Sequence, residues 1–343
     1  MTMQSLNRFK AGGRSPVSLR PQALVRRGTL DGGGLPLLVE PAIADLDAAA
    51  WARANREEVE RDLLEHGAVL FRGFGLDSAE RFEEFARAVS PGLLDYGERS
   101  SPRSEISQGV YTSTDYPAGE AIHFHNEQSY TRSWPTKLWF YCLEPATKGG
   151  ATPIADGRKV LALLAPEISR RFREKRVTYV RNYGDGMGLS WQTAFQTTSR
   201  AEVEAYCRAR GIESEWKEGD RLRTRQAFDT VVAHPSTGEA LWFEHAVFFH
   251  VSSLRPSVRE SLLAEFGEED LPSNTYYGDG SPIEDEALDA VREAYARAAV
   301  SFPWRKGDVL LIDNMLVSHS REPFEGPRKV LVAMAQLHPA TAA

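Results

Sequence analysis

The sequence contains only two cysteines in 343 residues, Cys142 and Cys207, and their spacing fits neither a disulfide framework nor a structural zinc site. It also lacks an apolar run near the roughly 20 residues that a membrane-spanning helix needs. Acidic residues outnumber basic ones by 48 to 41, so no overall positive field attracts nucleic acid or anionic lipid. These absences favour a globular protein of the reducing cytoplasm.

Several short catalytic signatures are absent as well. The sequence has no Gly-Lys dipeptide for a phosphate-binding loop, no Gly-x-Ser-x-Gly nucleophile elbow and no His-Glu-x-x-His metal pair. The glycines between positions 184 and 188 lack the spacing of a dinucleotide-binding turn and predict a flexible loop instead. The sequence therefore disfavours an enzyme built around a phosphate-bearing cofactor.

The first 30 residues carry six basic side chains and no acidic one, without the apolar stretch that a secretion signal needs. An Arg-rich transit peptide has a similar composition, but a terminal arm on the surface is the simpler interpretation. Three glycines follow at positions 32 to 34. We therefore predict a basic N-terminal arm over residues 1–34 and a single domain over residues 35–343.

Strand patterns outnumber helical patterns after residue 121. Apolar and alternating runs predict strands at 35–39, 68–74, 122–127, 138–143, 151–155, 177–183, 222–233, 241–251, 309–316 and 330–337. Helices are predicted at 47–66, 78–89, 159–175, 200–210, 256–266 and 283–300, with Ser78 as an N-cap and a hairpin turn at 235–238. Because strands seldom alternate regularly with helices, the pattern favours a mainly β barrel or sandwich with α insertions.

The segment 121–127, with the sequence Ala-Ile-His-Phe-His-Asn-Glu, contains the main metal-binding pattern. In an extended strand, His125 and Glu127 project from the same face, because side chains alternate with a period of two. One imidazole and one carboxylate suit Fe(II) or a related first-row divalent metal. A second imidazole from a distant segment would complete a facial triad and leave three coordination positions open. We therefore look for a third ligand elsewhere in the chain.

His319 is the candidate for that third ligand. The segment from Gly307 to Arg321 is typical of a turn followed by a buried strand, which delivers this histidine at its polar end. Arg328 opens the next predicted strand, and its guanidinium can hold a carboxylate through two hydrogen bonds. The sequence thus offers an acidic cosubstrate a charged partner beside the metal.

These residues follow one another in a recognisable order: His125-x-Glu127, then Gly149-Gly-Ala-Thr152, then His319 and Arg328. The order resembles the taurine dioxygenase family of Fe(II)- and 2-oxoglutarate-dependent oxygenases, in particular its aspartyl hydroxylases of peptide natural-product pathways. The resemblance spans about Gly67 to Leu337. It implies a double-stranded β-helix, or jelly roll, like that of clavaminate synthase, with helical insertions.

The resemblance also implies the roles of these side chains. Iron would be bound by His125, Glu127 and His319, and the distal carboxylate of 2-oxoglutarate would be held by Thr152 and Arg328. The cosubstrate would be oxidised with dioxygen to succinate and carbon dioxide, while an unactivated C–H bond of the substrate is hydroxylated. Desaturation or cyclisation would begin in the same way and stay open as outcomes.

Two features depart from the family pattern. The interval between His319 and Arg328 is shorter than in several relatives, and Arg321 offers a second guanidinium nearby. We favour Arg328, because a strand holds a side chain more rigidly than a loop does. The carboxylate ligand is often aspartate, whereas Glu127 occupies this position here. Because halogenating relatives lose this carboxylate, its presence favours oxygenation.

Other interpretations of the histidines stay open. His123 lies on the same face as His125 and is an alternative ligand, either in a cupin-like site or in a zinc hydrolase that activates water. A binding protein that keeps the jelly roll without activity is a third possibility. His245 and His250 flank an aromatic run and are expected in packing or in a substrate pocket.

The resemblance implies a small-molecule substrate. In the branch named above, the substrate is often an amino acid or an amino-acid derivative, either free or tethered to a carrier protein. The acidic net charge and the lack of long apolar runs give no reason to expect a nucleic-acid or membrane partner.

Overall fold

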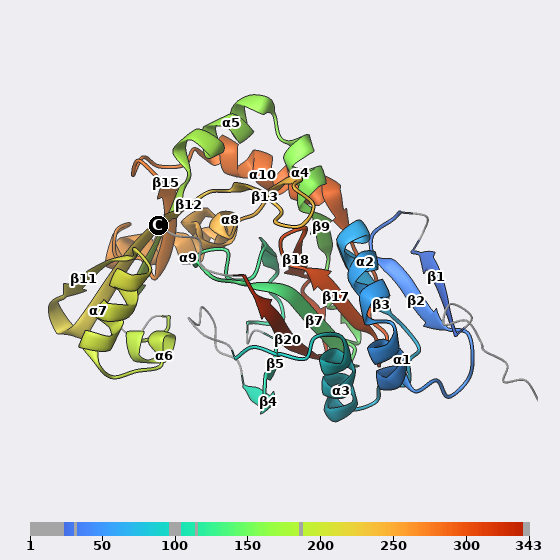
Figure 1. Cartoon of the computed structure of the whole chain (residues 1–343). Coiled ribbons are helices and arrows are strands. Elements are labelled where there is room, and N and C mark those ends of the chain that lie inside the picture. Colours follow the sequence, from blue (N-terminus) through green and yellow to red (C-terminus); the bar gives the residue numbers. More distant parts are fainter. Residues whose placement is uncertain (1–23, 31–32, 96–103, 114–115, 185–187, 339–343) are drawn as a thin grey trace, which may run out of the picture.

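The chain is organised around one large β-sheet (Figure 1). The computed structural model describes residues 24–30, 33–95, 104–113, 116–184 and 188–338. In spatial order, the eight strands of this sheet are β1 (Val25–Thr29), β2 (Leu37–Pro41), β3 (Ala68–Phe71), β17 (Val309–Asp313), β7 (Pro135–Glu144), β20 (Lys329–Leu337), β5 (Val110–Thr112) and β4 (Glu105–Ser107). Neighbouring strands are antiparallel except for β2 and β3, which are parallel.

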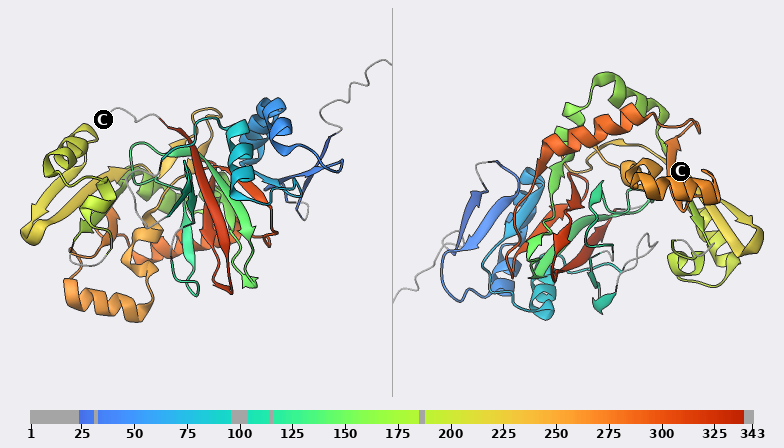
Figure 2. Two further views of the ribbon diagram at one scale, coloured as in Figure 1. Left: turned by 90° about the horizontal axis from the view of Figure 1, so that it is seen from below. Right: turned by 180° about the vertical axis from the view of Figure 1, so that it is seen from behind.

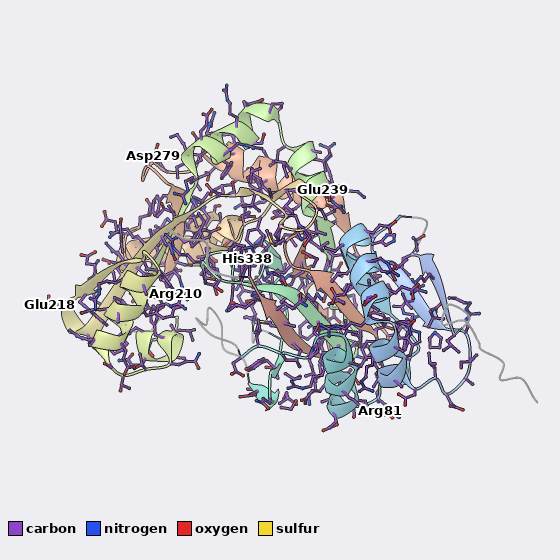
Figure 3. All side chains as sticks on the ribbon, viewed as in Figure 1. Arg81, Arg210, Glu218, Glu239, Asp279 and His338 are labelled. Atoms are coloured by element: carbon purple, nitrogen blue, oxygen red, sulfur yellow. The ribbon has the colours of Figure 1, made fainter. Side chains whose placement is uncertain are left out.

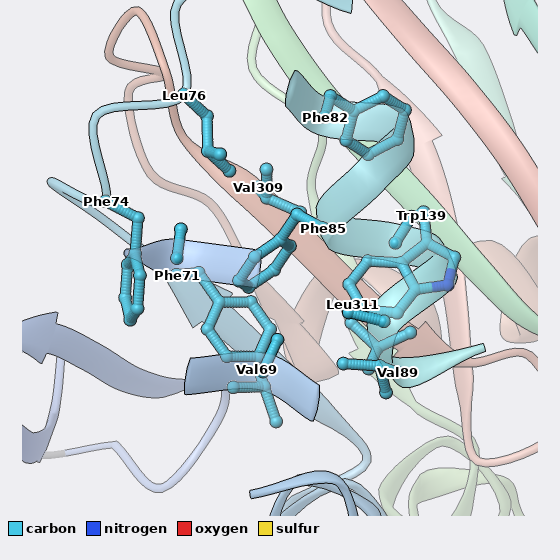
Figure 4. Close-up of a cluster of buried hydrophobic side chains, with 14 of the residues drawn as sticks. Val69, Phe71, Phe74, Leu76, Phe82, Phe85, Val89, Trp139, Val309 and Leu311 are labelled. Atoms are coloured by element: carbon cyan, nitrogen blue, oxygen red, sulfur yellow. The ribbon is translucent and has the colours of Figure 1, made fainter. Parts of the chain in front are cut away.

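The central strands contain long apolar runs, such as Leu138 to Leu143 of β7, because both of their faces are covered. In β17, Val309 and Leu311 belong to the hydrophobic cluster under the helices, and Leu310 and Ile312 belong to the cluster on the opposite face. The helices that cover the first face are α1 (Ala48–Ala54), α2 (Arg56–His66) and α3 (Ala79–Val89). Figure 4 shows aromatic side chains of this first cluster packed together, with Phe71 and Phe85 between Phe74 and Trp139 of β7.

The helix predicted at 47–66 is in fact two helices. Asp47 caps α1, since its side chain accepts a hydrogen bond from the backbone N–H of Ala50 at 2.9 Å. Asn55 ends α1, because its amide donates back to the carbonyl of Trp51 at 2.8 Å and competes with a further helical turn. The expected N-cap of α3, Ser78, is confirmed.

A four-stranded sheet lies across the second face of the large sheet. Its strands, in spatial order, are β16 (Ala299–Val300), β9 (Ile154–Asp156), β18 (Val317–Arg321) and β6 (Ile122–His125). Ile154 and Val317 of this sheet share one hydrophobic cluster with Phe140 and Val332 of the large sheet. Two facing sheets with a common core confirm the predicted mainly β fold with α insertions.

The strand predicted at 309–316 is wrong in its extent, because the chain turns before its end. The carboxylate of Asp313 accepts hydrogen bonds from the backbone N–H groups of Met315 and Leu316 at 2.9 and 3.0 Å. An aspartate that bonds two and three residues ahead closes a tight turn. The turn moves the chain from β17 of the large sheet into β18 of the facing sheet, so His319 lies in the middle of a strand of its own.

A third sheet and two helices form a lobe at the opposite end of the molecule from α1 to α3 (Figure 2). Its parts are β11 (Glu213–Lys217), β12 (Arg221–Phe228), β10 (Val177–Tyr183), β15 (Ser273–Tyr277), α6 (Trp191–Phe195), α7 (Arg200–Ala209) and the 3-10 turn Glu218–Asp220. Figure 3 labels Arg210 and Glu218 on this lobe.

The remaining elements connect the sheets. They are β8 (Lys148–Gly149), α4 (Gly157–Leu163), α5 (Pro166–Lys175), β13 (Val231–Ala233), β14 (Ala240–Trp242), α8 (Ala246–Phe249), the 3-10 turn Val251–Ser253, α9 (Pro256–Phe266), α10 (Asp285–Ala298) and β19 (Phe324–Glu325). The predicted hairpin turn joins β13 to β14 and is confirmed. Among the described residues, no helix is both long and apolar enough to cross a membrane.

Three further predicted elements are interrupted. The strand expected at 222–233 is split into β12, which ends at Phe228, and β13, which begins at Val231 in another sheet. The strand expected at 241–251 ends at Trp242, and the aromatic run becomes α8, because the carboxylate of Glu244 accepts a hydrogen bond from the N–H of Val247 at 3.0 Å and starts a helix. A short apolar run alone does not distinguish a strand from a buried helix. The helix expected at 159–175 is split into α4 and α5 before Pro166, whose ring disfavours a helical residue ahead of it.

Part of the expected N-terminal arm is ordered. Strand β1 pairs with β2, and Arg27 forms ion pairs with Glu58 and Asp62 of α2. Residues 1–23 lie outside the described part of the chain, as do residues 185–187 of the expected flexible loop.

Candidate metal centre

Strands β6 and β18 bring the two predicted histidine ligands together. His125 and His319 are direct partners across these antiparallel strands, and their ring centroids are 4.3 Å apart. Glu127 follows two residues after the end of β6. One potential ligand atom from each of His125, Glu127 and His319 lies within 4.8 Å of the others, and all three residues are buried. The three side chains expected from the sequence therefore converge on one point.

The ring of His125 is held in one orientation. Its Nδ1 lies 2.8 Å from the carbonyl oxygen of His123. Because a carbonyl only accepts hydrogen bonds, Nδ1 carries the proton, and Nε2 carries the lone pair that a metal needs. Two imidazoles on neighbouring strands and one carboxylate just after the first of these strands fit a ferrous ion by the chemistry of their donors.

A buried asparagine fixes the backbone of Glu127. The side-chain oxygen of Asn314 accepts from the N–H of Glu127 at 2.8 Å, and its amide donates to the carbonyls of Glu127 and Pro135 at 2.9 and 2.8 Å. Asn126 in turn donates to the carbonyl of Asn314 at 2.7 Å. These bonds tie the residue after β17 to the segment after β6, so they hold the carboxylate ligand against the strand pair that carries the histidines.

Replacing Asn314 by alanine is expected to lower the free energy of unfolding by about 3 kcal/mol, since each buried polar group left without a partner costs about 1–3 kcal/mol. Metal affinity should fall as well, by about 10- to 100-fold, because the ligand loses its support. Chemical denaturation and Fe(II) titration measure the two effects. Asn55→Ala is the matched control, because it also removes a buried amide but lies in α1–α2, away from the site. Equal loss of metal affinity in both variants would contradict this role.

The other candidate histidines do not join the group. The Nε2 atom of His123 lies 3.2 Å from the carbonyl of Ser253, so this ring is directed toward the segment after α8. His245 packs with its ring centroid 4.6 Å from that of His125, and its Nδ1 lies 3.2 Å from the carbonyl of Asn126. Within the described residues, neither belongs to the set able to share a metal, and the alternative ligand His123 is not supported.

A small cavity connects the histidines with the predicted 2-oxoglutarate residues. It is lined by Ser113, Ile122, His125, Phe140, Thr152, His319, Ser320, Arg321, Arg328, Val330 and Val332. Thr152 and Arg328 are in contact, since the guanidinium donates to the threonine hydroxyl at 3.3 Å and to the carbonyl of Gly150 at 2.8 Å. Burial, together with the neighbouring charge of Arg321, lowers the pKa of Arg328 to about 10. The side chain therefore keeps its positive charge at neutral pH.

The expectation that Arg328 is on a strand and Arg321 on a loop is wrong, because Arg321 ends β18 and Arg328 lies just before β20. The two arginines differ instead in their contacts. Arg321 donates to the backbone carbonyls of Tyr116, Pro117 and Glu120 at 3.0, 2.6 and 2.8 Å. Its terminal nitrogens thus hold the segment that leads into β6. Among the described contacts, Arg328 bonds a single backbone carbonyl, that of Gly150, and its bond to Thr152 places its guanidinium beside the hydroxyl that shares the cavity.

The glycine pair of the family motif has a steric explanation. Gly149 and Gly150 both have positive φ, at 67° and 71°. A Cβ atom on Gly149 would lie 2.3 Å from the carbonyl oxygen of Pro323, and one on Gly150 would lie 3.0 Å from Cδ of Arg328. A side chain on Gly149 would therefore collide with the backbone of Pro323, and one on Gly150 would crowd the stem of Arg328.

Sequence reasoning missed three residues that support the site. Asn126 and Asn314 are fully buried, and their hydrogen bonds to each other's segments cross between parts of the chain far apart in sequence. Trp304 donates its indole N–H to the hydroxyl of Thr152 at 3.1 Å. The only available signal was polar residues beside strongly apolar runs, and that pattern also describes ordinary strand ends.

A buried acid lies next to Asn126, whose side-chain oxygen accepts a hydrogen bond from the backbone N–H of that acid. Glu244 is fully buried and accepts hydrogen bonds from Tyr295 at 3.0 Å and from the N–H of Val247 at 3.0 Å. Burial raises the pKa of Glu244 from 4.5 to about 7. The folded protein therefore binds more protons than the unfolded chain between about pH 4.5 and pH 7, and the free energy of unfolding should fall as the pH rises through this range.

Above pH 7 this contribution should be constant, because the acid is then ionised in both states. Denaturation curves at a series of pH values, compared between the protein and a Glu244→Gln variant, measure the effect as a difference in slope. The slope between pH 4.5 and 7 should be smaller in the variant. Two parallel stability profiles would show that Glu244 titrates normally.

Two facing sheets with a buried His-Glu-His group define a jelly-roll enzyme of the mononuclear metal class. The chain belongs to the taurine catabolism dioxygenase TauD, TfdA family, whose model matches residues 33–334. The resemblance expected from the motifs is therefore confirmed, and the protein is an oxidoreductase of the Fe(II)- and 2-oxoglutarate-dependent dioxygenases.

Two individual proteins are similar to this chain over most of its length. The chain is 44% identical to the dapdiamide synthesis protein DdaC of Enterobacter agglomerans over 288 residues, which is 84% of this chain and 88% of the relative. It is 29% identical over 320 residues to a clavaminate synthase-like protein of Arabidopsis thaliana, covering 88% of this chain and 93% of that one.

Solved structures with the same fold include PvcB from Pseudomonas aeruginosa, with a TM-score of 0.55, 17% identity and 94% of each chain covered. A second solved structure of PvcB is described as that of an Fe, α-ketoglutarate dependent oxygenase from an isonitrile synthetic pathway. The complex of AAD-2 with Mn(II) and N-oxalylglycine has a TM-score of 0.54 and 13% identity, and covers 93% of this chain and 99% of that one. These likenesses confirm the jelly-roll fold.

Proposed function

We propose that His125, Glu127 and His319 bind one ferrous ion and that Arg328 and Thr152 hold the distal carboxylate of 2-oxoglutarate. The enzyme then hydroxylates an unactivated C–H bond of an amino acid or amino-acid derivative, with release of succinate and carbon dioxide. The observation that carries the proposal is the convergence of the three ligand side chains within 4.8 Å, at a cavity that also contains Arg328 and Thr152.

Each residue of the proposed site has a definite task in this reaction. When bound, the iron supplies the oxidising chemistry that no side chain provides. Arg328 contributes a charged, planar donor that suits a carboxylate, and its burial strengthens the attraction. Thr152 accepts hydrogen bonds from Trp304 and Arg328, which directs its own hydroxyl hydrogen toward a third group.

The walls of the cavity restrict water. His125 and His319 are each 7% exposed, and Phe140 packs with its ring centroid 5.0 Å from that of His319. A site with little solvent protects reactive species from side reactions. The same burial lets the ligand side chains hold one geometry through turnover, because neighbouring strands fix their backbones.

The names of the relatives support a role in a natural-product pathway. DdaC is named for dapdiamide synthesis, and PvcB is described as part of an isonitrile synthetic pathway. We infer a place in a natural-product pathway, with an amino-acid-like substrate that is free or attached to a carrier protein. Action in the cytoplasm is part of this proposal and is supported by the low cysteine content.

Succinate release tests the proposal. The purified protein is incubated with Fe(II), 2-oxoglutarate and air, alone and with each of a set of L-amino acids and N-acetyl-L-amino acids. We expect dioxygen-dependent succinate formation that one or more of these compounds stimulate, with a hydroxylated product about 16 mass units heavier than the substrate, or about 18 when ¹⁸O₂ is supplied. Hydrolytic activity that requires Zn(II) and no dioxygen would contradict the proposal.

A further inference from the structure

The side chain of Arg321 lines the same cavity as the histidine ligands. Across the pair of strands β18 and β6, His319 lies opposite His125, and Arg321 lies opposite Ile122. All four residues line the cavity of the metal centre. His319 and Arg321 are alternate residues of β18, so their side chains leave the backbone about 7 Å apart on one face. A group that Arg321 binds in this cavity is therefore close to the metal.

The guanidinium of Arg321 is only partly satisfied by the protein. Its two terminal nitrogens donate to the backbone carbonyls of Tyr116, Pro117 and Glu120, none of which lines the cavity. Its Nε atom is buried and has no hydrogen-bond partner among the described residues, and Arg321 as a whole is 7% exposed. A buried N–H group without a partner costs free energy, and such groups are rare in folded proteins. The unused N–H therefore indicates a ligand that the cavity receives.

Arg321 and Arg328 are two buried cations beside one cavity. Phe324 packs against both, with its ring centroid 5.2 Å from Cζ of Arg321 and 5.6 Å from that of Arg328. The described polar partners of the two guanidiniums are backbone carbonyls and the hydroxyl of Thr152, so no described carboxylate pairs with either. Carbonyls satisfy N–H donors but carry no net charge. The cavity therefore favours anionic ligands.

The charges of the loaded site favour an anionic substrate as well as an anionic cosubstrate. A ferrous ion, the carboxylate of Glu127 and the two guanidiniums carry three positive charges in total when the histidines are neutral. 2-Oxoglutarate is a dianion and balances two of them, with its distal carboxylate at Arg328. One positive charge is left, and Arg321 is the cation with the unused N–H. Because an unbalanced charge in a buried site is unfavourable, we expect the substrate to bring a negative charge.

We propose that Arg321 recognises the substrate through a hydrogen bond from its Nε to a carboxylate of that molecule. The inference depends on the proposed function and narrows its substrate class to acids whose carboxylate is only a few bonds from the C–H group that reacts. Arg321 is then a specificity-determining residue, whereas Arg328 serves the cosubstrate. The terminal nitrogens of Arg321 keep their bonds to the carbonyls, so the guanidinium is in place before the acid binds.

The first test compares acids with their amides on the wild-type protein. L-Amino acids, N-acetyl-L-amino acids and the primary carboxamide of each are titrated anaerobically into the protein with Fe(II) and 2-oxoglutarate, and the change in the visible band gives the dissociation constants. Stimulated succinate release is measured separately in air. The best acid should bind about 30-fold or more tightly than its amide, since loss of one partner of a buried charge pair has effects of this size, and kcat/KM should follow.

Two variants of Arg321 separate its charge from its bonds to the backbone. Arg321→Gln keeps an amide that can donate to a backbone carbonyl but has no charge, whereas Arg321→Lys keeps the charge. We expect Arg321→Gln to lose the preference for the acid by raising its KM and dissociation constant, and Arg321→Lys to keep part of the preference. Denaturation curves measure the stability of both variants, which should fall in each because contacts with the carbonyls are lost.

Arg255→Met is the matched control. Arg255 forms an ion pair with Glu120 at 2.9 Å, and 68% of its side chain is exposed. This variant therefore disturbs the segment that Arg321 holds, but from outside the cavity, and it should keep the preference for the acid. Arg328→Met should also keep this preference at saturating 2-oxoglutarate, because it removes the partner of the cosubstrate.

Four results would overturn the inference while the proposed function stands. They are equal binding and turnover of acid and amide by the wild-type protein, a preference that survives in Arg321→Gln, a preference that is also lost in Arg255→Met, and a KM for 2-oxoglutarate that rises in Arg321→Gln as much as the KM for the acid. The last result would place the cosubstrate at the Nε atom. If Arg321→Gln does not fold, the wild-type comparison and Arg321→Lys decide. A wild-type protein that forms no visible band would contradict the proposed function itself.

Discussion

Replacing His319 by alanine is expected to reduce the rate of succinate formation by at least about 10³-fold, because the facial triad loses one of its three ligands and the metal supplies the oxidising chemistry. The iron content of the purified protein should fall with the activity. Steady-state assays and metal analysis measure the two effects. The strand pair itself should survive, since β18 pairs on both edges with β6 and β9 through backbone hydrogen bonds.

His66→Ala is the control for His319→Ala. His66 closes α2, and its ring lies 3.1 Å from the carbonyl of Gly34, away from the cavity. This variant should bind iron and turn over 2-oxoglutarate as the unchanged protein does. If His319→Ala retained full iron content and activity, the third ligand would have to be sought elsewhere.

Replacing Arg328 by methionine is expected to raise the KM for 2-oxoglutarate by about 10²-fold or more, because a buried carboxylate would lose its charged partner. The stem of methionine fills much of the space of the arginine stem, so the turn at Gly149 and Gly150 should keep its shape. Iron binding without the cosubstrate should be unchanged, since Arg328 is not among the three side chains that can share the metal.

Arg321→Met distinguishes the two guanidiniums of the cavity. Arg321 bonds three backbone carbonyls of residues 116–120, so its loss should lower the free energy of unfolding more than the affinity for 2-oxoglutarate. The opposite pattern, with a larger KM effect in Arg321→Met than in Arg328→Met, would assign the cosubstrate to Arg321.

Local patterns were sufficient to predict most of the elements. The strand at 177–183 and the helix at 256–266 have the predicted bounds, and α3 begins directly after its predicted cap, Ser78. The errors lie where a single side chain ends an element. Asn55, Asp313 and Glu244 each interrupt a pattern by bonding to the backbone, and the apolar periodicity on both sides gives no sign of it.

In the site as well, some residues could be predicted from local sequence and others could not. His125, Glu127 and His319 could be proposed because their residue types and order carry a chemical meaning that survives without coordinates. The support from Asn314 and Trp304 could not be predicted, because it depends on which segments the folded sheets place side by side. Strand rigidity is the wrong reason to prefer Arg328, because Arg321 is the last residue of β18 whereas Arg328 lies just before β20. The preference rests instead on the contacts of Arg321 with backbone carbonyls, which no sequence pattern reveals.

The central claim is that His125, Glu127 and His319 share one ferrous ion that also binds 2-oxoglutarate. Anaerobic titration of the protein with Fe(II) in the presence of 2-oxoglutarate tests it directly through a visible charge-transfer band. We predict that the band saturates at one iron per chain and disappears in both His125→Ala and His319→Ala. A band that persists in both variants would contradict the claim, because the iron would then be held by other residues.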